Sequence, residues 1–394
     1  MWTENLGAAA LALTLPGSVY LATLTAAAAL PVRRTQPCAA GQPQRLVIVV
    51  PAHNESTGML RTLCSLKAEM AEMAGDELTR IVVVADNCDD DTAQVALCAG
   101  VDVLERHDLR RRGKGHALRH AFEMLVDADA FIVVDADTDV APGFLRAMRS
   151  ALAGNALTGG ADALQCRYGV RDALASRRAT LADVALGAWN VLRPRGRAAL
   201  GLSAGILGNG FALTRRTLQA VPYTADSIVE DVEYHHLLVK AGLRVMWVDG
   251  ALVRGDMPVA RAAAAQQRAR WEGGRLRLLA SQGPALAARV LAGQWRLADP
   301  LLDLLLWPLA WHVSLLLLAA ALGATPVQWA ASAGLAGVTL HVLTALCLMP
   351  ARREHLLALL GAPAYVAWKL CLASTTWRAA GRHAAWVRSD RRPS

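Results

Sequence analysis

The sequence predicts an α/β domain with a parallel sheet and apolar helices at both ends of the chain. Short apolar runs alternate with helix-like segments between residues 46 and 134, which is typical of a parallel sheet covered by helices. Hydrophobic residues make up 54% of the 394 residues, and their excess lies at the two ends. The middle of the chain therefore forms one domain of ordinary polarity, and the ends are candidates for membrane spans.

The first apolar segment, residues 6–30, carries no charge and is long enough to cross a bilayer core of about 30 Å. A cleaved signal peptide fits less well, because Glu4 precedes the segment where a basic region is expected. Two further spans are predicted over Leu304–Leu322 and Val327–Met349, joined by a short turn at Thr325–Pro326. We expect the histidines inside these two spans, His312 and His341, to form hydrogen bonds within the helix bundle.

The last apolar stretch, Leu356–Trp377, is interrupted by Gly361, Pro363 and Lys369. We interpret it as an interfacial or re-entrant helix, with a fourth span as the alternative. Basic pairs follow the spans at Arg33–Arg34 and Arg352–Arg353. The positive-inside rule therefore places the middle of the chain and its C-terminal tail in the cytoplasm.

These features predict five parts of the chain and a linker, Pro37–Pro43. The parts are an N-terminal transmembrane helix at 1–32, a sheet domain at 42–260, interfacial helices at 261–300, two transmembrane helices at 301–350, and an interfacial or re-entrant helix with a basic tail at 351–394.

The strands of the sheet are predicted by continuous apolar runs, as expected for strands buried on both faces. The runs are Leu46–Val50, Ile81–Val84, Val101–Leu104 and Phe131–Val134. Helices are predicted between them from Leu60 to Met73, from Thr92 with Asp90 or Asp91 as its cap, and over His116–Val126. Ligands of such sheets bind beyond the carboxyl ends of the strands.

The formal net charge is +8, and the arginines lie beside apolar runs and in the tail. This distribution fits anionic lipid and phosphate, and no signature of nucleic-acid binding accompanies it, so we expect no nucleic-acid partner. The seven cysteines form no CxxC pair, which argues for a reduced compartment and against a disulfide frame or structural zinc.

Asp135 and Asp137 directly follow the strand that ends at Val134. In an extended segment, a spacing of two points both side chains the same way. Two such carboxylates favour a divalent cation, Mg²⁺ or Mn²⁺, shared with phosphate oxygens. A turn rich in Asp is the alternative interpretation.

Other polar residues also follow strands. Asp86 ends the second strand, where it accepts a hydrogen bond from a base or ribose, or caps the next helix. The first strand ends at Pro51, His53 and Glu55. We expect these residues to form the neighbouring side of a pocket that binds the nucleotide. Lys114 lies between two glycines, which permit close approach to a phosphate; a solvated basic turn is the alternative.

The pair Glu230–Asp231 precedes a helix-like segment. Asp231 is the candidate general base that takes a proton from an acceptor hydroxyl, with ordinary capping as the alternative. Gln267, Arg270 and Trp271 lie on one face of a predicted helix. There Arg270 can grip a diphosphate and Trp271 can stack on a sugar ring. A basic juxtamembrane helix is the alternative.

In this order, the motifs from Leu46 to Trp271 resemble the membrane-bound glycosyltransferases of family 2, the group that includes cellulose, hyaluronan and poly-N-acetylglucosamine synthases. The resemblance depends most on the DxD pattern of Asp135 and Asp137 and on the QxxRW pattern of Gln267, Arg270 and Trp271. It implies a cytoplasmic catalytic domain of the GT-A (Rossmann-like) fold, a nucleotide-sugar donor, a divalent metal and inversion at the anomeric carbon.

The resemblance also implies roles for single residues. Asp86 contacts the uridine with Glu55 nearby, Asp137 is the more direct metal ligand, and Asp231 is the base. Gln267, Arg270 and Trp271 line the diphosphate and the acceptor entrance. The region that holds the acceptor sugar corresponds to Gly208, Asn209, Gly210 and Phe211, together with Glu230.

Two departures from the family pattern qualify this expectation. Ala85–Asp86–Asn87–Cys88 replaces the commoner Asp-Asp-Gly-Ser, so the nucleotide contact differs in detail. The predicted membrane part is also small for a polymer channel within one chain, which leaves open single transfer to a lipid-linked acceptor or channel formation by oligomerisation.

The expected function is transfer of a sugar from a UDP-sugar to a glycan or lipid-linked acceptor, at the cytoplasmic face of the bacterial inner membrane, in exopolysaccharide or cell-envelope polysaccharide synthesis. Non-processive transfer that forms a glycolipid is the alternative. A nucleotidyltransferase is more remote, because residues 51–55 are not the glycine-rich basic loop that it needs. An inactive membrane scaffold is remote because the acidic residues are retained.

Overall fold

The computed structural model describes residues 1–31, 45–73, 77–158, 163–258, 260–350 and 352–379. Arg33–Arg34, the linker Pro37–Pro43 and the basic tail from residue 380 lie outside the described residues. The described residues form two compact units. The sheet unit takes those within Arg33–Asp172 and Ser203–Ala263, and the helical unit takes those within Met1–Val32, Ala173–Leu202 and Ala264–Ala385.

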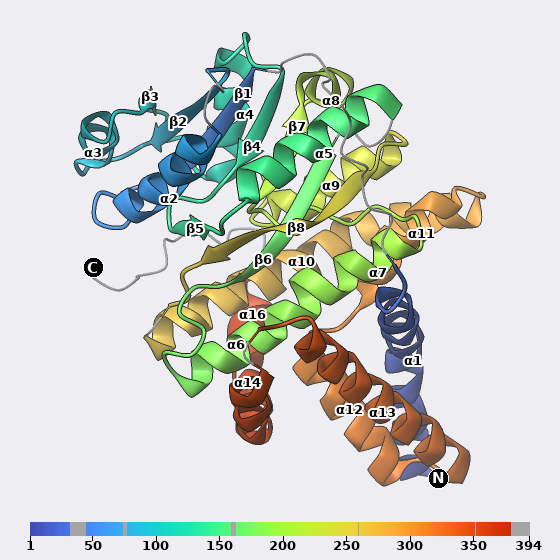
Figure 1. The fold of residues 1–394 in the computed structure, drawn as a ribbon. Coiled ribbons are helices and arrows are strands. Elements are labelled where there is room, and N and C mark those ends of the chain that lie inside the picture. The colour runs from blue at the N-terminus through green and yellow to red at the C-terminus, as the bar shows by residue number, and fades with distance from the viewer. Residues whose placement is uncertain (32–44, 74–76, 159–162, 259, 351, 380–394) are drawn as a thin grey trace. The chain divides into compact units, whose positions relative to one another are not determined.

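Within its described residues, the sheet unit contains one eight-stranded sheet with the order β3-β2-β1-β4-β7-β6-β8-β5 (Figure 1). The strands are β1 Leu46–Ala52, β2 Thr79–Asp86, β3 Asp102–Arg106, β4 Ala130–Val133, β5 Thr138–Val140, β6 Ala163–Val170, β7 Phe211–Thr214 and β8 Val245–Gly255. Each of the four predicted strands overlaps one of β1 to β4, because their uninterrupted apolar runs suit strands buried on both faces.

The sheet is mixed, whereas the sequence predicted a parallel one. The first four strands in chain order are parallel, which gives the Rossmann-like order 3-2-1-4. Beyond β4, strand β7 runs antiparallel to both β4 and β6, and β5 runs antiparallel to β8, while β6 and β8 are parallel. The fold is therefore α/β with a Rossmann-like first half.

Helices cover both faces of this sheet. Alternate residues of β1 enter opposite cores: Ile48 packs with α2 and α5, and Val49 packs with α4 and α9. The helices of the sheet unit are α2 Met59–Glu72, α3 Thr92–Cys98, α4 Lys114–Met124, α5 Phe144–Thr158, α8 Arg215–Ala220 and α9 Glu230–Lys240.

The helical unit is assembled from three separate parts of the chain. These parts supply α1 Trp2–Ala28; α6 Arg177–Gly187, the π-helix η1 Ala188–Leu192 and α7 Arg193–Ala199; and α10 Arg261–Leu291, η2 Trp295–Leu297, α11 Ala298–Leu305, α12 Leu309–Leu322, α13 Thr325–Cys347, α14 Arg352–Ala358, η3 Leu359–Gly361, α15 Ala362–Cys371 and α16 Ala373–Ala379. The first three residues of α10 belong to the sheet unit.

Residues 173–202 thus leave the predicted continuous domain of 42–260 and fold with the apolar helices. A Cβ atom on Gly196 of α7 would lie 2.4 Å from the carbonyl oxygen of Leu24 in α1, so glycine permits this close approach. Ala188 and Leu192 bury their side chains with Ala28 of α1. Their burial against α1 explains why this segment belongs to the helical unit.

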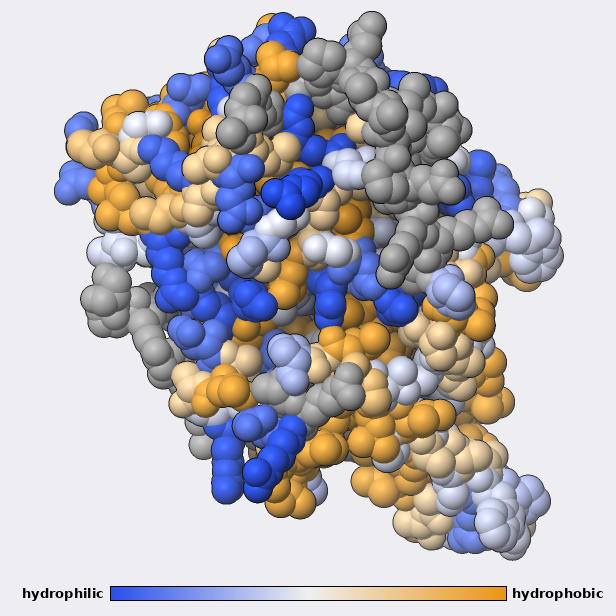
Figure 2. All heavy atoms as spheres, viewed as in Figure 1, coloured by the Kyte–Doolittle hydropathy of each residue, from blue (hydrophilic) through white to orange (hydrophobic). Residues whose placement is uncertain are grey.

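In the helical unit, α1, α12 and α13 pack through small and branched apolar residues. Buried histidines add polar contacts: His312 lies 3.0 Å from Ser18 Oγ, and His341 lies 2.7 Å from Thr25 Oγ1. The expectation that both histidines form hydrogen bonds within the bundle is confirmed. Hydrophobic residues gather on the visible face of these three helices (Figure 2).

Among the described residues, two helices are long and apolar enough to cross a membrane, α1 and α13. The pair Trp295–Leu305 and Leu309–Leu322 would be a third span if it crossed as one, but it is bent by 79°. The span predicted over Leu304–Leu322 therefore begins within α11 and contains this bend, and its crossing of a membrane stays a prediction. Pro308 lies in the break, and proline lacks the N–H that would continue the helix.

The predicted turn at Thr325–Pro326 is also displaced. Helix α13 begins at Thr325, and Pro326 occupies its first turn, where the missing N–H costs nothing. Gly323 and Ala324 form the connection instead. The stretch predicted as one interfacial or re-entrant helix, Leu356–Trp377, is divided among α14, η3, α15 and α16.

Candidate active site

The carboxyl ends of β1, β2 and β4 meet at one edge of the sheet. In the parallel register, Pro51 pairs with Val84, and Val49 pairs with Val133. The polar residues that follow these three strands are therefore collected by the fold, as expected for a ligand-binding edge.

Asp86, at the end of β2, is buried and forms an ion pair with the buried guanidinium of Arg106, with Nη1 2.5 Å from Oδ1. Asn87 Nδ2 donates to the same oxygen at 3.0 Å. His53 Nδ1 lies 2.7 Å from the carbonyl oxygen of Asp86, which joins the ends of β1 and β2. The sequence placed Asp86 here but did not indicate Arg106, which ends β3 and showed no motif.

Glu55 follows β1 and is also buried. Its backbone N–H donates to Thr92 Oγ1 at 2.8 Å, at the start of α3. Asp90, not Asp91, supplies the carboxylate to the first turn of α3, because Thr92 N–H donates to Asp90 Oδ1 at 3.0 Å.

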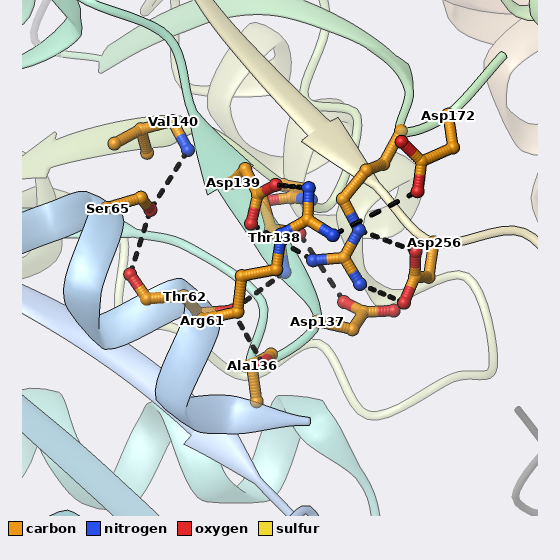
Figure 3. A network of polar contacts seen from close by, with 12 residues as sticks. Arg61, Thr62, Ser65, Ala136, Asp137, Thr138, Asp139, Val140, Asp172 and Asp256 are labelled. Atoms are coloured by element: carbon orange, nitrogen blue, oxygen red, sulfur yellow. Dashed lines mark hydrogen bonds and ion pairs between the residues drawn. The ribbon is translucent and has the colours of Figure 1, made fainter. Parts of the chain in front are cut away.

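The DxD segment is a turn rather than an extended chain, so the argument from extended spacing does not apply. Thr138 N–H donates to the Asp135 carbonyl at 3.2 Å. Helix α2 holds the turn from one side: Thr62 Oγ1 donates to the Ala136 carbonyl at 2.7 Å and accepts from Thr138 N–H at 3.0 Å (Figure 3). Asp256, which directly follows β8, donates from its backbone N–H to the Asp137 carbonyl at 3.3 Å.

Asn209 holds the same turn from a third side. Its Oδ1 accepts from Asp135 N–H at 3.2 Å, and its Nδ2 donates to Thr138 Oγ1 at 2.8 Å. Asn209 is 1% exposed. We predicted Asn209 as an acceptor-binding residue, and the structure gives its side chain a positioning role toward the DxD turn.

A neighbouring ion network uses the acids next to this turn. Arg171 donates through Nη1 to Asp139 Oδ1 at 3.0 Å and through Nε to Asp256 Oδ1 at 2.6 Å. Arg61 Nη2 lies 2.7 Å from Asp139 Oδ2 (Figure 3). Burial lowers the pKa of Arg171, but Asp256 and Asp139 outweigh burial and raise it. The Asp139 carboxylate is therefore held by two arginines.

Lys114, the first residue of α4, points to this turn. Its ammonium donates to the Asp135 carboxylate and to the Gly208 carbonyl, the latter at 2.5 Å. Burial lowers the pKa of Lys114, but Asp135, then Glu230 and Asp231, outweigh burial and raise it. The alternative of a solvated basic turn is wrong.

Glycine is required on the two sides of Lys114 for different physical reasons. Gly113 has a φ of +120° and nothing within 4 Å of an added Cβ, so it is required by conformation. A Cβ on Gly115 would lie 2.4 Å from the Ala225 carbonyl oxygen, so it is required by close backbone packing. The explanation from phosphate approach is not needed for Gly115.

Residues 208–210 form a tight loop before β7. Gln165 of β6 fixes it, because Nε2 donates to the Asn209 carbonyl at 2.8 Å and Oε1 accepts from Leu207 N–H at 2.9 Å. Gly208 has a φ of +80°, and an added Cβ would lie 3.2 Å from Asp231 Oδ2. The loop therefore brings Asp231 close to the Gly208 backbone, whose carbonyl binds Lys114.

Replacing Gly210 by Ala is expected to destabilise the sheet unit by ~3 kcal/mol. Gly210 has a φ of +65°, and an added Cβ would lie 2.3 Å from Cys166 Sγ and 2.9 Å from Val253. Gly143→Ala is the matched control, with a φ of +81° and nothing within 4 Å, and should cost only ~1–2 kcal/mol. Denaturant unfolding compares them, and equal losses would contradict the packing argument.

Glu230 and Asp231 begin α9, whose N-cap residue is Val229 without a side-chain cap. Asp231 Oδ1 accepts from Val232 N–H at 2.9 Å in the first turn of α9, where the helix N-terminus favours negative charge. The capping alternative therefore holds for Asp231, and it does not exclude a role as base. Burial, and next the neighbouring Asp231, raise the pKa of Glu230 to about 8. Burial and Asp231 thus favour the neutral, protonated form of Glu230.

Replacing Glu230 by Gln should make stability less sensitive to alkaline pH. With its pKa raised from 4.5 to about 8, folded Glu230 retains a proton that the unfolded chain loses, so stability falls as pH rises between these values. At ~1.4 kcal/mol per pKa unit, the loss is on the order of a few kcal/mol. Thermal unfolding is measured in the presence of a chelator from about pH 5 to about pH 9. The stability of Glu230→Gln relative to wild type should increase over this range. Parallel profiles would exclude the raised pKa.

The donor set suits a hard divalent cation. Asp135 and Asp137 provide carboxylate oxygens on one short turn, and Asp137 is 8% exposed. Among the described residues, no three or more His, Cys, Asp or Glu side chains are grouped as a complete metal site. Mg²⁺ is typically held by one or two carboxylates and substrate phosphates, so this pair fits such an ion.

The QxxRW residues lie on α10 in the helical unit. Gln267 is buried, and Arg270 and Trp271 are half-buried. The sheet unit therefore holds the predicted residues Pro51, His53, Glu55, Asp86, Lys114, Asp135, Asp137, Gly208, Asn209, Gly210, Glu230 and Asp231, and the helical unit holds the other three. Sequence reasoning missed Thr62, Arg106 and Gln165, which contact the site residues through tertiary structure.

Of three solved structures that are similar to the chain, the first supports the fold. The mannosyltransferase PcManGT from Pyrobaculum calidifontis, in complex with GDP-Man and Mn²⁺, is 17% identical, with a TM-score of 0.53 over 93% of this chain and 99% of that chain. Glucosyl-3-phosphoglycerate synthase from Mycobacterium tuberculosis, in complex with Mn²⁺, UDP and phosphoglyceric acid, is 21% identical, with a TM-score of 0.38 over 57% of this chain and 75% of that chain. Mannosyl-3-phosphoglycerate synthase from Rubrobacter xylanophilus is 20% identical, with a TM-score of 0.39 over 58% and 75%.

No curated protein sequence matches the chain significantly. The sequence model described as "Glycosyltransferase like family 2" matches residues 43–274, which is more than half of the chain and extends from β1 through Trp271. The protein therefore belongs to the glycosyltransferase-like family 2.

Proposed function

We propose that the protein transfers a sugar, with inversion, from a UDP-sugar to a glycan or lipid-linked acceptor at the cytoplasmic face of the bacterial inner membrane. The observation that carries this proposal is the cluster of Lys114 with Asp135, Glu230 and Asp231, beside the Gly208 loop at the carboxyl edge of the sheet. Membership of the family supplies the reaction class.

In this proposal, the ends of β1 and β2 hold the nucleotide. Pro51, His53 and Glu55 form one side of its pocket, and Asp86 contacts the uridine. The ion pair with Arg106 and the contact with His53 support the role of Asp86, because they fix its position before any ligand binds.

The DxD turn holds the diphosphate. Asp137 and Asp135 bind Mg²⁺ or Mn²⁺, which when bound stabilises negative charge on the leaving diphosphate. Lys114 keeps a positive charge at Nζ beside Asp135. Thr62 and Asn209 fix the turn, so the carboxylates need little rearrangement when the donor arrives.

Asp231 acts as the general base on the acceptor hydroxyl. Its proximity to Gly208 supports this role, because the loop of Gly208 and Gly210 is the expected acceptor region. The raised pKa of Glu230 favours its neutral form, which limits the negative charge next to the base. On α10, Gln267 and Arg270 are assigned to the diphosphate and Trp271 to the acceptor.

The membrane part of the proposal assigns α1, α13 and the bent α11–α12 pair to the bilayer, with possible spans limited to two or three in the described residues. Such a small bundle favours single transfer to a lipid-linked acceptor, which forms a glycolipid, over a polymer channel within one chain. Polysaccharide synthesis then requires oligomerisation or a separate export system.

Purified full-length protein in lipid nanodiscs tests the proposal. UDP-sugars, and GDP-sugars as the comparison set, are supplied with Mn²⁺, and the released nucleoside diphosphate is measured with and without a membrane lipid extract. We expect release from a UDP-sugar that depends on the extract. Release only from a GDP-sugar would correct the donor, and no release from any donor under these conditions would reject the proposed transfer.

A further inference from the structure

Lys369 interrupts the apolar stretch that contains α15, yet it is only 5% exposed. Its ammonium forms an ion pair with the carboxylate of Glu272, which follows Trp271 on α10. A buried lysine is costly unless it is paired. Glu272 therefore explains how α15 can carry a charge at a buried position.

A second contact repeats this arrangement one helical turn earlier. The guanidinium of Arg268 lies over the ring of Tyr365, 5.8 Å from the centroid. Arg268 and Glu272 are four residues apart on α10, and Tyr365 and Lys369 are four apart on α15. Because such positions share one helical face, two successive turns of α15 contact two successive turns of α10.

These contacts flank the QxxRW residues. Arg268 and Glu272 each directly follow a motif residue, Gln267 and Trp271. Neighbouring residues on a helix are separated by about 100°. The face held by α15 therefore determines the rotation of α10 about its axis, and with it the direction of the motif side chains.

The next turn of α10 is anchored to α11. Arg275 Nη2 lies 3.0 Å from Asp303 Oδ2 and donates to the Asp303 carbonyl at 2.5 Å. The Arg275 guanidinium also lies 4.6 Å from the ring centroid of Trp189. This anchor limits movement along α10, so loss of the α15 contact should affect the motif segment rather than the whole helix.

We propose that Lys369 is a positioning residue for sugar transfer, which sets the orientation of Gln267, Arg270 and Trp271 through its ion pair with Glu272. This inference rests on the proposed function. An apolar pair of similar volume would often be equally or more stable than a buried ion pair. The pair therefore gives α15 and α10 a defined register, and not only stability.

The test compares single and charge-exchanged variants of the full-length protein in nanodiscs. Lys369→Met and Glu272→Gln should each lower kcat by ~10-fold or more, since small misplacements at a reaction site have large effects. The double variant Lys369→Glu with Glu272→Lys should recover to within about three-fold of wild type, because the two sites are coupled. Glu354→Gln, at an exposed acid of α14, is the control and should keep wild-type kcat.

Hydrogen–deuterium exchange separates this inference from the proposed function. Lys369→Met should increase exchange in residues 264–276 and leave that of α2 unchanged, whether or not the donor is known. Unchanged exchange there, or singles with near-wild-type kcat, would overturn the inference. If Lys369→Met increases exchange in residues 264–276 while the wild-type protein transfers no sugar, the α15 contact is supported and the sugar-transfer role is rejected.

Discussion

Replacing Asp231 by Asn is expected to lower the turnover of sugar transfer by about 10³-fold, within the range for loss of a general base. Asn keeps the size of the side chain but cannot accept the acceptor proton. The carboxylate lies beside Gly208 and raises the pKa of Lys114, so it belongs to the charged cluster. Donor binding should be nearly unchanged, because the nucleotide is assigned to other residues.

The matched control for this variant is Glu233→Gln, in the same helical turn. Glu233 Oε2 accepts from Ser227 N–H at 3.2 Å, a contact that Gln can largely retain. Turnover with saturating donor and acceptor, together with calorimetric titration of UDP, gives the comparison. An Asp231→Asn enzyme with near-normal turnover would remove Asp231 as the base.

The second large effect is expected for the metal ligands. Chelation should stop transfer, and Mn²⁺ or Mg²⁺ should restore it. Asp137→Asn should lower turnover by ~10²–10³-fold, which corresponds to a few kcal/mol of lost charge stabilisation. It should also weaken Mn²⁺ binding measured by electron paramagnetic resonance in the presence of UDP.

Asp139→Asn distinguishes a metal ligand from a merely acidic neighbour. Asp139 lies two residues from Asp137, but its carboxylate is held by Arg171 and Arg61. We expect this variant to lose stability and to retain Mn²⁺ affinity. Equal Mn²⁺ affinities in the two variants, or transfer that is indifferent to a chelator, would count against the DxD assignment.

The first half of the sheet could be predicted because its strands are buried on both faces. Val47–Val50 and Val82–Val84 are almost fully buried, and such runs show in the sequence without tertiary information. β5 contains only three residues, and β8 alternates in burial along part of its length. The mixed second half depends on pairing between distant strands, which local pattern does not specify.

Residues 173–202 show a different limit. α6 is weakly amphipathic, and its sequence does not say which core will bury its apolar side. The assignment to the helical unit depends on Gly196 meeting Leu24, two residues far apart in the chain. Pro308 is a helix-breaking signal that the sequence contains. A span is predicted from the mean hydropathy of the whole segment, and that mean does not show a break.

The site residues were predictable where an acidic side chain lies at or just after the end of a strand, as for Asp86, Asp135 and Asp137. The order of motifs, not any one of them, carried the family resemblance. The hydrogen bonds that hold the DxD turn were not predictable. Thr62 lies 74 residues before its partner in the turn, and Asn209 lies 74 residues after its partner. Arg106 and Gln165 likewise have no local signature.

The configuration of the new glycosidic bond, determined by nuclear magnetic resonance on the isolated product, tests the proposed chemistry most directly. If Asp231 removes the acceptor proton while the diphosphate leaves from the opposite side of the sugar, one displacement occurs. The product must then have the anomeric configuration opposite to that of the donor. A product that retains the donor configuration would contradict this account.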